Sequence, residues 1–140
     1  MSLAVVYSRA LSGMAAPLVE VEAHLANGLP AFNIVGLPDT EVKESRDRVR
    51  AAIIQSGFDF PAKKITVNLA PADLPKESGR FDLPIAVGIL AASGQIAISP
   101  EELAKYELAG ELALSGLLRP VRGALAMVWQ STQARRRFIL

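Results

Sequence analysis

The sequence predicts a two-layer α+β domain in which helices pack against one mixed sheet. Three features lead to this fold class. Residues 17–26 and 64–69 alternate apolar with polar side chains, which is the pattern of half-buried strands. Residues 39–56 place apolar side chains at helical spacing among charged ones, and residues 83–92 carry no charged or strongly polar side chain. Strand patterns come first and then interleave with helix patterns, as in α+β and α/β domains.

Turn signals organise the predicted strands. Asn27-Gly28 is the strongest short hairpin signal, so we expect strand 17–26 to turn there and residues 31–35 to return beside it. Pro30 indicates that this part of the ladder lies at a sheet edge, because proline cannot donate a ladder hydrogen bond. The remaining strands are expected at residues 4–7, 64–69, 106–108, 112–114 and 138–140.

Glycine, proline and capping residues delimit the predicted helices. Asp39 opens the first helix just after Pro38, and Gly57 ends it. Ser99 and Glu102 form a capping box, with Pro100 at the first helical position, and start a short helix. A last helix is expected at residues 123–134.

Residues 73–93 form the segment around which the fold is organised. Residues 73–80 are a polar loop, and the apolar run that follows is too short to span a membrane. A helix that is apolar on all sides must be covered on all sides. We therefore predict a central buried helix, with Asp82 as its N-cap, Pro84 in its first turn and Gly94 as its stop.

The composition narrows the class of protein. A chain of 140 residues, 51% of them hydrophobic, suits one folded domain with a real core. A net charge of +1 argues against strong electrostatic binding of nucleic acid by this domain alone. The absence of cysteine excludes disulfides and thiolate metal sites.

Without a signal sequence or a bilayer-spanning run, the expected location is the cytoplasm, without membrane contact. The apolar ending at residues 138–140 suggests a piece of a longer protein.

Two groups of polar residues have competing interpretations. Glu20, Glu22 and His24 share one strand face and could be metal ligands, but a water-facing strand surface is favoured. The charged faces of helix 39–56 could contact DNA or a partner, but a solvated helix with pairs such as Glu44–Arg48 is favoured.

Arg46 differs from its neighbours because it lies on the apolar stripe of helix 39–56. Its aliphatic stem could lie along the core with the guanidinium reaching solvent. The alternative is a buried structural ion pair, for which Asp82 and Asp73 are the candidate partners of Arg46.

The loop before the buried helix contains the ingredients of an anion site. Lys76, Ser78, Gly79 and Arg80 precede a helix N-terminus, where backbone N–H groups favour anions. They do not form a P-loop, because no Gly-x-x-x-x-Gly-Lys-Ser/Thr occurs in the chain. An ordinary turn with charged residues is the favoured interpretation.

Four blocks of sequence carry a resemblance to a known family. Together they are similar to the N-terminal (Lon-protease-like, "ChlI") domain of the ComM/YifB family of magnesium-chelatase-like AAA+ ATPases. The resemblance implies that an AAA+ module follows, which would bind ATP and Mg²⁺, form a hexameric ring and act in DNA branch migration during natural transformation. The four blocks are IVGLPD (34–39), KESRDRVR (43–50), VNLAPADLPK (67–76) and RFDLPIA (80–86).

The same resemblance implies the ribosomal protein S5 domain 2-like fold, as in the Lon protease domain, but not Lon chemistry. The Lon nucleophilic serine matches Asp82, and the Lon lysine matches about Leu125. A Ser–Lys dyad needs an amine beside the hydroxyl. A shifted match would offer Ser78 with Lys76, but two residues in one loop make an unconvincing dyad. We therefore expect no peptidase activity.

The resulting expectation is a single domain over residues 1–140, non-catalytic and without its own cofactor or metal. It would help to assemble the ring with its AAA+ module and neighbouring subunits, and contact DNA or a partner. The alternatives are a subunit of a magnesium-chelatase-type metal insertion complex and, less favoured, a Ser–Lys peptidase. The candidate DNA or partner contacts are Lys76, Arg80, Arg48 and Arg50.

Overall fold

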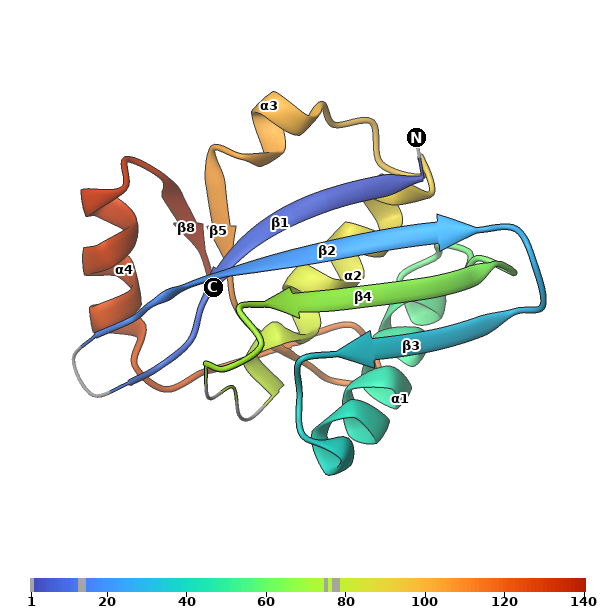
Figure 1. The fold of residues 1–140 in the computed structure, drawn as a ribbon, viewed down its shortest axis with the longest axis horizontal. Helices are drawn as coiled ribbons and strands as arrows, with labels where there is room; N and C mark the ends of the chain where they lie inside the picture. The colour runs from blue at the N-terminus through green and yellow to red at the C-terminus, as the bar shows by residue number, and fades with distance from the viewer. Residues whose placement is uncertain (1, 13–14, 75, 77–78) are drawn as a thin grey trace.

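The chain folds around a mixed sheet, which the described residues build from six strands in the order β3-β4-β2-β1-β5-β8 (Figure 1). The computed structural model describes residues 2–12, 15–74, 76 and 79–140. A short antiparallel pair, β6 with β7, lies apart from the main sheet. The strands are β1 (Leu3–Arg9), β2 (Leu18–Ala26), β3 (Ala31–Val35), β4 (Lys64–Ala70), β5 (Tyr106–Leu108), β6 (Glu111–Leu112), β7 (Leu118–Arg119) and β8 (Arg137–Ile139).

The position of β4 shows that the hairpin predicted at Asn27-Gly28 is wrong. β4 runs antiparallel to β2 along one edge and parallel to β3 along the other, so β3 is not the partner of β2. An Asn-Gly pair favours a turn locally but does not specify which strand fills the space beside β2. β4 takes this central place because Ile65, Val67 and Leu69 are then fully buried. β3 lies at the sheet edge, as Pro30 indicated.

Two of the helices cover one face of the sheet. α1 (Asp39–Gln55) and α2 (Asp82–Ala92) lie behind the strands in Figure 1, and α2 contacts β1, β2 and α1. Gly88 allows a close approach, because a Cβ there would lie 3.1 Å from Cβ of Ala23 on β2. Ile85 and Ile89 of α2 are fully buried, which confirms the predicted central helix. The other helical segments are η1 (Gly79–Phe81), α3 (Pro100–Leu103) and α4 (Ala124–Gln133).

The helix starts are partly as predicted. Ser99 caps α3, since its Oγ accepts a hydrogen bond from the N–H of Glu102 at 3.1 Å. Asp82 is not the N-cap of α2, because Phe81 occupies that position and Asp82 is the first helical residue. Its carboxylate is drawn into tertiary hydrogen bonds instead. The strand predicted at residues 112–114 is also displaced, to Glu111–Leu112.

The second face of the sheet carries polar side chains. Glu20 and His24 are exposed, and Glu22 accepts a hydrogen bond from Asn68 Nδ2 at 2.8 Å. Within the described ranges, no group of three or more His, Asp and Glu side chains is placed to hold a metal. No helix in the same ranges is both long and apolar enough to cross a membrane.

The burial of α2 predicts a sharp contrast between two isoleucines. Ile89→Ala is expected to lower the free energy of unfolding by about 2–5 kcal/mol, because it leaves a cavity behind the sheet. Ile54→Ala is the matched control on α1: Ile54 is 50% exposed, and its truncation should change stability by no more than about 0.5 kcal/mol. Urea unfolding followed by circular dichroism measures both. Equal losses would contradict the central position of α2.

Candidate functional site

The carboxylate of Asp82 is the centre of a buried polar cluster at the N-terminal end of α2. Its side chain is withdrawn from solvent, and four hydrogen bonds reach its two oxygens. Ser45 Oγ donates to Oδ1 at 2.7 Å, and the backbone N–H of Leu112 donates to Oδ2 at 3.1 Å. Arg48 donates from Nε to Oδ2 at 2.6 Å and from a terminal nitrogen to Oδ1 at 3.3 Å. The cluster therefore joins α1, α2 and β6.

The electrostatics of this cluster are dominated by burial and by one ion pair. Burial raises the pKa of Asp82, and the hydrogen bonds from Arg48, Ser45 and the Leu112 N–H pull it partly back. Burial lowers the pKa of Arg48, but the hydrogen bond and the charge of Asp82 outweigh it, so that this pKa is raised. With its lone pairs occupied by donors, the carboxylate is not available as a nucleophile or a general base.

The pairing of Asp82 corrects one prediction. Arg46 is not its partner; it donates from Nη1 to the carbonyl oxygen of Phe32 on β3 at 3.1 Å. The charge of Asp73 instead acts on Lys76, where it offsets part of the lowering of the pKa that burial causes. The reason is helical geometry: Ser45 and Arg48, three residues apart, share the side of α1 that faces α2, whereas Arg46 is turned toward β3.

Two of the predicted contact residues are buried. Lys76 is 4% exposed, and its Nζ donates to the carbonyl oxygens of Pro71 at 2.6 Å and Leu74 at 2.9 Å. Burial lowers the pKa of Lys76, and the charge of Asp73 partly offsets this effect. Arg80 is 3% exposed and donates from Nη1 to the carbonyl oxygen of Arg122 at 3.0 Å. Both cations thus donate hydrogen bonds to backbone carbonyls of neighbouring segments, residues 71–74 for Lys76 and Arg122 for Arg80.

The other two predicted contacts lie on α1 and differ in accessibility. Arg48 is engaged with Asp82, and Glu44 lies 3.8 Å from its Nη1, as the four-residue spacing suggested. Arg50 is exposed, with its guanidinium 4.9 Å from the ring centre of Phe60. Of the four residues, Arg50 alone therefore presents its charge freely to solvent.

A cavity of about 420 Å³ adjoins the cluster. Its charged lining residues are Glu41, Arg80, Glu111 and Arg122. η1 is packed closely here, since a Cβ at Gly79 would lie 2.6 Å from Glu111 Oε1. Acidic and basic groups balance one another in this lining, which makes the cavity a poor site for a single anion or cation.

Comparison with known proteins identifies the family. The chain matches the family described as "Subunit ChlI of Mg-chelatase" over residues 21–140. It is 59% identical to "Uncharacterized protein YifB" of Salmonella typhimurium and 56% identical to "Competence protein ComM" of Haemophilus influenzae. The chain belongs to the ChlI family. All 140 of its residues are covered in both alignments, but they span only 27% of each relative, in the N-terminal part.

The ChlI-family chain contains a second buried charge cluster that the sequence analysis missed. Glu107 of β5 is fully buried and accepts two hydrogen bonds from Arg9, at 2.7 and 2.9 Å, and one from Arg136 at 3.2 Å. The Arg136 guanidinium also lies 4.2 Å from the ring centre of Tyr7. This cluster joins β1, β5 and Arg136, the residue just before β8. The available signal was a glutamate in the middle of the short strand predicted at residues 106–108.

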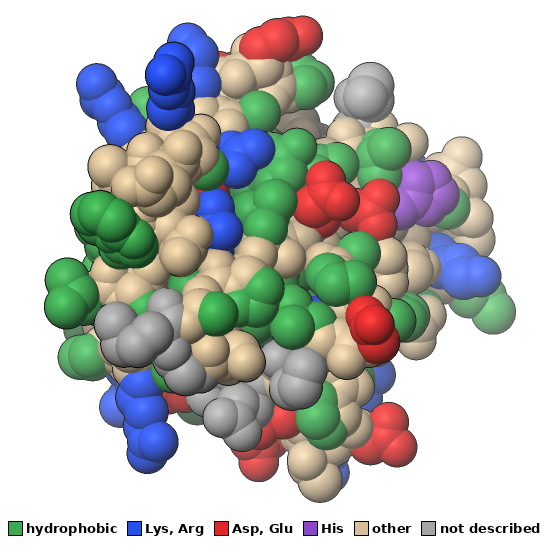
Figure 2. All heavy atoms as spheres, turned by 60° about the vertical axis from the view of Figure 1, so that its left-hand side comes forward, with side chains coloured by type: hydrophobic (Ala, Val, Ile, Leu, Met, Phe, Trp, Pro, Cys, Tyr) green, Lys and Arg blue, Asp and Glu red, His purple; other side chains and the backbone are tan. Residues whose placement is uncertain are grey.

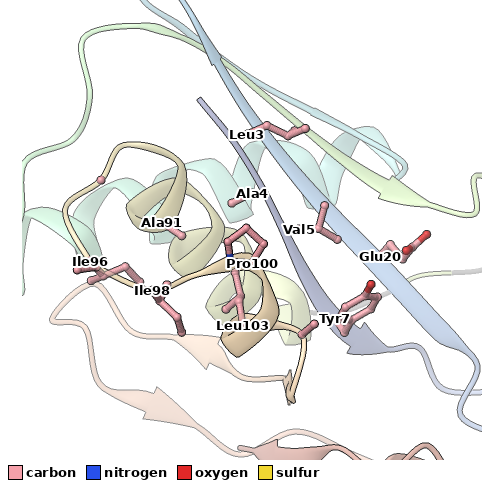
Figure 3. A pocket seen from close by; sticks show the side chains of 13 residues that line it. Leu3, Ala4, Val5, Tyr7, Glu20, Ala91, Ile96, Ile98, Pro100 and Leu103 are labelled. Atoms are coloured by element: carbon pink, nitrogen blue, oxygen red, sulfur yellow. The ribbon is translucent and has the colours of Figure 1, made fainter. Parts of the chain in front are cut away.

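An apolar pocket of about 550 Å³ lies on the other side of the molecule, between β1 and the segment leading into α3 (Figure 3). Leu3, Val5, Ile98 and Leu103 are among its aliphatic lining residues, and Glu20 lies at one end. Its walls offer apolar contact and few groups for acid–base chemistry.

The Asp82 cluster predicts a stability difference between two arginines of α1. Arg48→Met is expected to lower the free energy of unfolding by about 3–5 kcal/mol, because Asp82 stays buried without its charge partner. Arg46→Met is the matched control, since it removes one hydrogen bond to a carbonyl and should cost about 1 kcal/mol. Chemical denaturation at neutral pH measures both. Equal losses, or a larger loss for Arg46→Met, would contradict the assigned pairing.

The raised pKa of Asp82 predicts the pH dependence of the same variant. A raised pKa means that the folded state holds this proton more tightly than the unfolded state, so the group contributes most stability at low pH and loses it as the pH rises above the ordinary value of 3.8. The positive charge of Arg48 stabilises the ionised form of Asp82 and so reduces this loss of stability. The destabilisation caused by Arg48→Met should therefore be smallest near pH 3.8 and grow toward neutral pH. Unfolding curves across this range test it, and a pH-independent difference would refute it.

Proposed function

We propose that this chain is the non-catalytic N-terminal domain of a ComM-type AAA+ ATPase that processes DNA. In this proposal the domain helps to assemble the ATPase ring and contacts DNA or a partner during branch migration in natural transformation. The observation that carries the proposal is the 56% identity to the competence protein over the whole chain. The chain spans 27% of that relative. In this proposal the ATPase activity belongs to a module outside the matched part.

The proposal includes the ribosomal protein S5 domain 2-like fold, as in the Lon protease domain. A mixed sheet with α2 buried against β1 and β2 supports this assignment. The sequence RFDLPIA (80–86), one of the four blocks similar to the ComM/YifB family, spans the start of that helix.

The non-catalytic part of the proposal rests on the Asp82 cluster. Asp82 stands where Lon has its serine, and its carboxylate is saturated by Arg48, Ser45 and a backbone N–H. Leu125, which matches the Lon lysine, is 79% exposed on α4 and has no amine. Lys76 holds two carbonyl oxygens with its Nζ, and Ser78 lies outside the described residues.

The partners follow from the same proposal. The AAA+ module of the full protein would bind ATP and Mg²⁺, and the domain would contact that module and the neighbouring subunits of a hexamer. The whole assembly would work in the cytoplasm, where the DNA substrate is found.

A second candidate function is a subunit of a magnesium-chelatase-type metal insertion complex. The description of the matched family, which names a subunit of Mg-chelatase, favours it. The two candidates differ in what the full protein acts on, a DNA junction or a tetrapyrrole. Natural transformation requires the first activity and not the second, so a transformation assay distinguishes them.

A domain exchange tests the proposed function. Replacing the matched segment of Haemophilus influenzae ComM by this chain should restore natural transformation well above the level of a strain whose ComM lacks that segment, because the fold and the contacts to the ATPase module would be preserved. Transformation frequency with marked DNA is the measurement, and unmodified ComM is the upper control. A chimera that accumulates at normal levels but transforms like the deletion strain would overturn the proposal.

A further inference from the structure

Charge is divided unequally along the chain. Residues 1–112 contain ten Lys or Arg and fourteen Asp or Glu, a net charge of −4. Residues 113–140 contain five arginines and neither Asp nor Glu, a net charge of +5. The nearly neutral total therefore hides a basic segment that forms β7, α4 and β8. The five residues are Arg119, Arg122, Arg135, Arg136 and Arg137.

The arginines of this segment flank α4. Arg122 comes just before the helix and Arg135 just after it, and both are exposed, as are Arg119 and Arg137. Within the described part of the chain, none of these four guanidiniums lies within 4 Å of a carboxylate oxygen, although Arg122 lines the cavity that Glu41 and Glu111 also line. Figure 2 brings the α4 side forward and shows Lys and Arg side chains in blue above and below a group of green hydrophobic side chains at the left edge.

The outer face of α4 is apolar and contains the tryptophan. The helix packs on the core through Ala126, Met127 and Ser131, whereas Leu125 is 79%, Val128 39% and Trp129 61% exposed. The helix has ten residues, a length of about 15 Å, with Arg122 two positions before its start and Arg135 two positions after its end. In the chain, Trp129 therefore lies between two exposed arginines, one at each end of its helix.

We propose that α4 and its flanking arginines form a contact site for single-stranded nucleic acid. Bases would stack on Trp129, and phosphates would pair with Arg122 and Arg135. Stacking on an exposed aromatic beside a basic track is how proteins bind single strands without reading sequence. Arginine suits this role because its planar fork matches phosphate oxygens. The inference deepens the proposed function by naming the DNA-contacting surface, and it rests on that function.

Charge favours a nucleic acid over a protein on this face. An apolar protein partner needs only Leu125, Val128 and Trp129, whereas the same segment also carries four exposed arginines, besides Arg136, which is paired with Glu107, and has no acidic residue. The new site differs from the residues first expected to touch DNA. Of those, Lys76 and Arg80 are buried and Arg48 is paired with Asp82, whereas Arg50 is exposed.

Trp129 is a built-in reporter of the site, because it is the single tryptophan of the chain. Titration of the 140-residue protein with oligo(dT) at low salt is expected to quench its fluorescence, and added salt should reverse the effect. In the double variant Arg122→Ala/Arg135→Ala, the slope of log K against log salt should become about 1.4 shallower, since each lost phosphate contact on a single strand contributes about 0.7. The control Lys43→Ala/Lys64→Ala removes the same charge from exposed residues elsewhere and should keep the wild-type slope.

A second measurement separates stacking from charge. Trp129→Ala should weaken binding of fluorescein-labelled oligo(dT), followed by anisotropy, by about 5- to 150-fold, whereas Trp129→Phe should retain part of the affinity. Trp129 is largely exposed, so the unfolding curves of both variants should remain close to the wild-type curve.

Four outcomes would overturn the inference. Binding that leaves Trp129 fluorescence unchanged, or that is lost equally in the lysine control, would move the contact to another surface and leave the proposed function standing. If oligo(dT) does not bind at low salt, this domain does not contact single-stranded nucleic acid. The domain exchange would still test the proposed function. Self-association that changes Trp129 emission without DNA and disappears in Trp129→Ala would make the face a protein contact.

Discussion

The buried ion pair between Asp82 and Arg48 is the constraint on which the described fold depends. A carboxylate withdrawn from water is costly unless donors satisfy both oxygens. Ser45, Arg48 and the N–H of Leu112 do this, and they come from α1 and β6. Satisfying one charge therefore fixes the start of α2 against two other elements, and α2 in turn covers β1 and β2.

A second buried carboxylate does the same at the opposite side of the sheet. Glu107 binds Arg9 of β1 and Arg136, the residue just before β8, so ion pairs reinforce the ladder hydrogen bonds that join β1, β5 and β8. Both clusters use arginine, whose several donors can satisfy a carboxylate with more than one bond. In both clusters, hydrogen bonds to a buried carboxylate hold separate segments of the chain together.

The proposed contact surface lies on the basic segment. Four of its five arginines are exposed, its helix presents Trp129 outward, and the rest of the chain carries a net charge of −4. A nearly neutral domain can in this way carry a locally basic segment, because potential depends on where charges lie and not only on their sum.

The sequence by itself determined the local elements and the family. Alternation predicted β2 and β4, helical spacing predicted α1, the unbroken apolar run predicted the burial of α2, and four sequence blocks indicated the ChlI family. Only the tertiary structure decided that β4 separates β2 from β3, that Arg48 and not Arg46 pairs with Asp82, and that Lys76 and Arg80 are buried. These outcomes depend on contacts between segments far apart in the chain, 37 residues for Ser45 and Asp82, and local pattern carries no information about which of several possible partners completes a shared core.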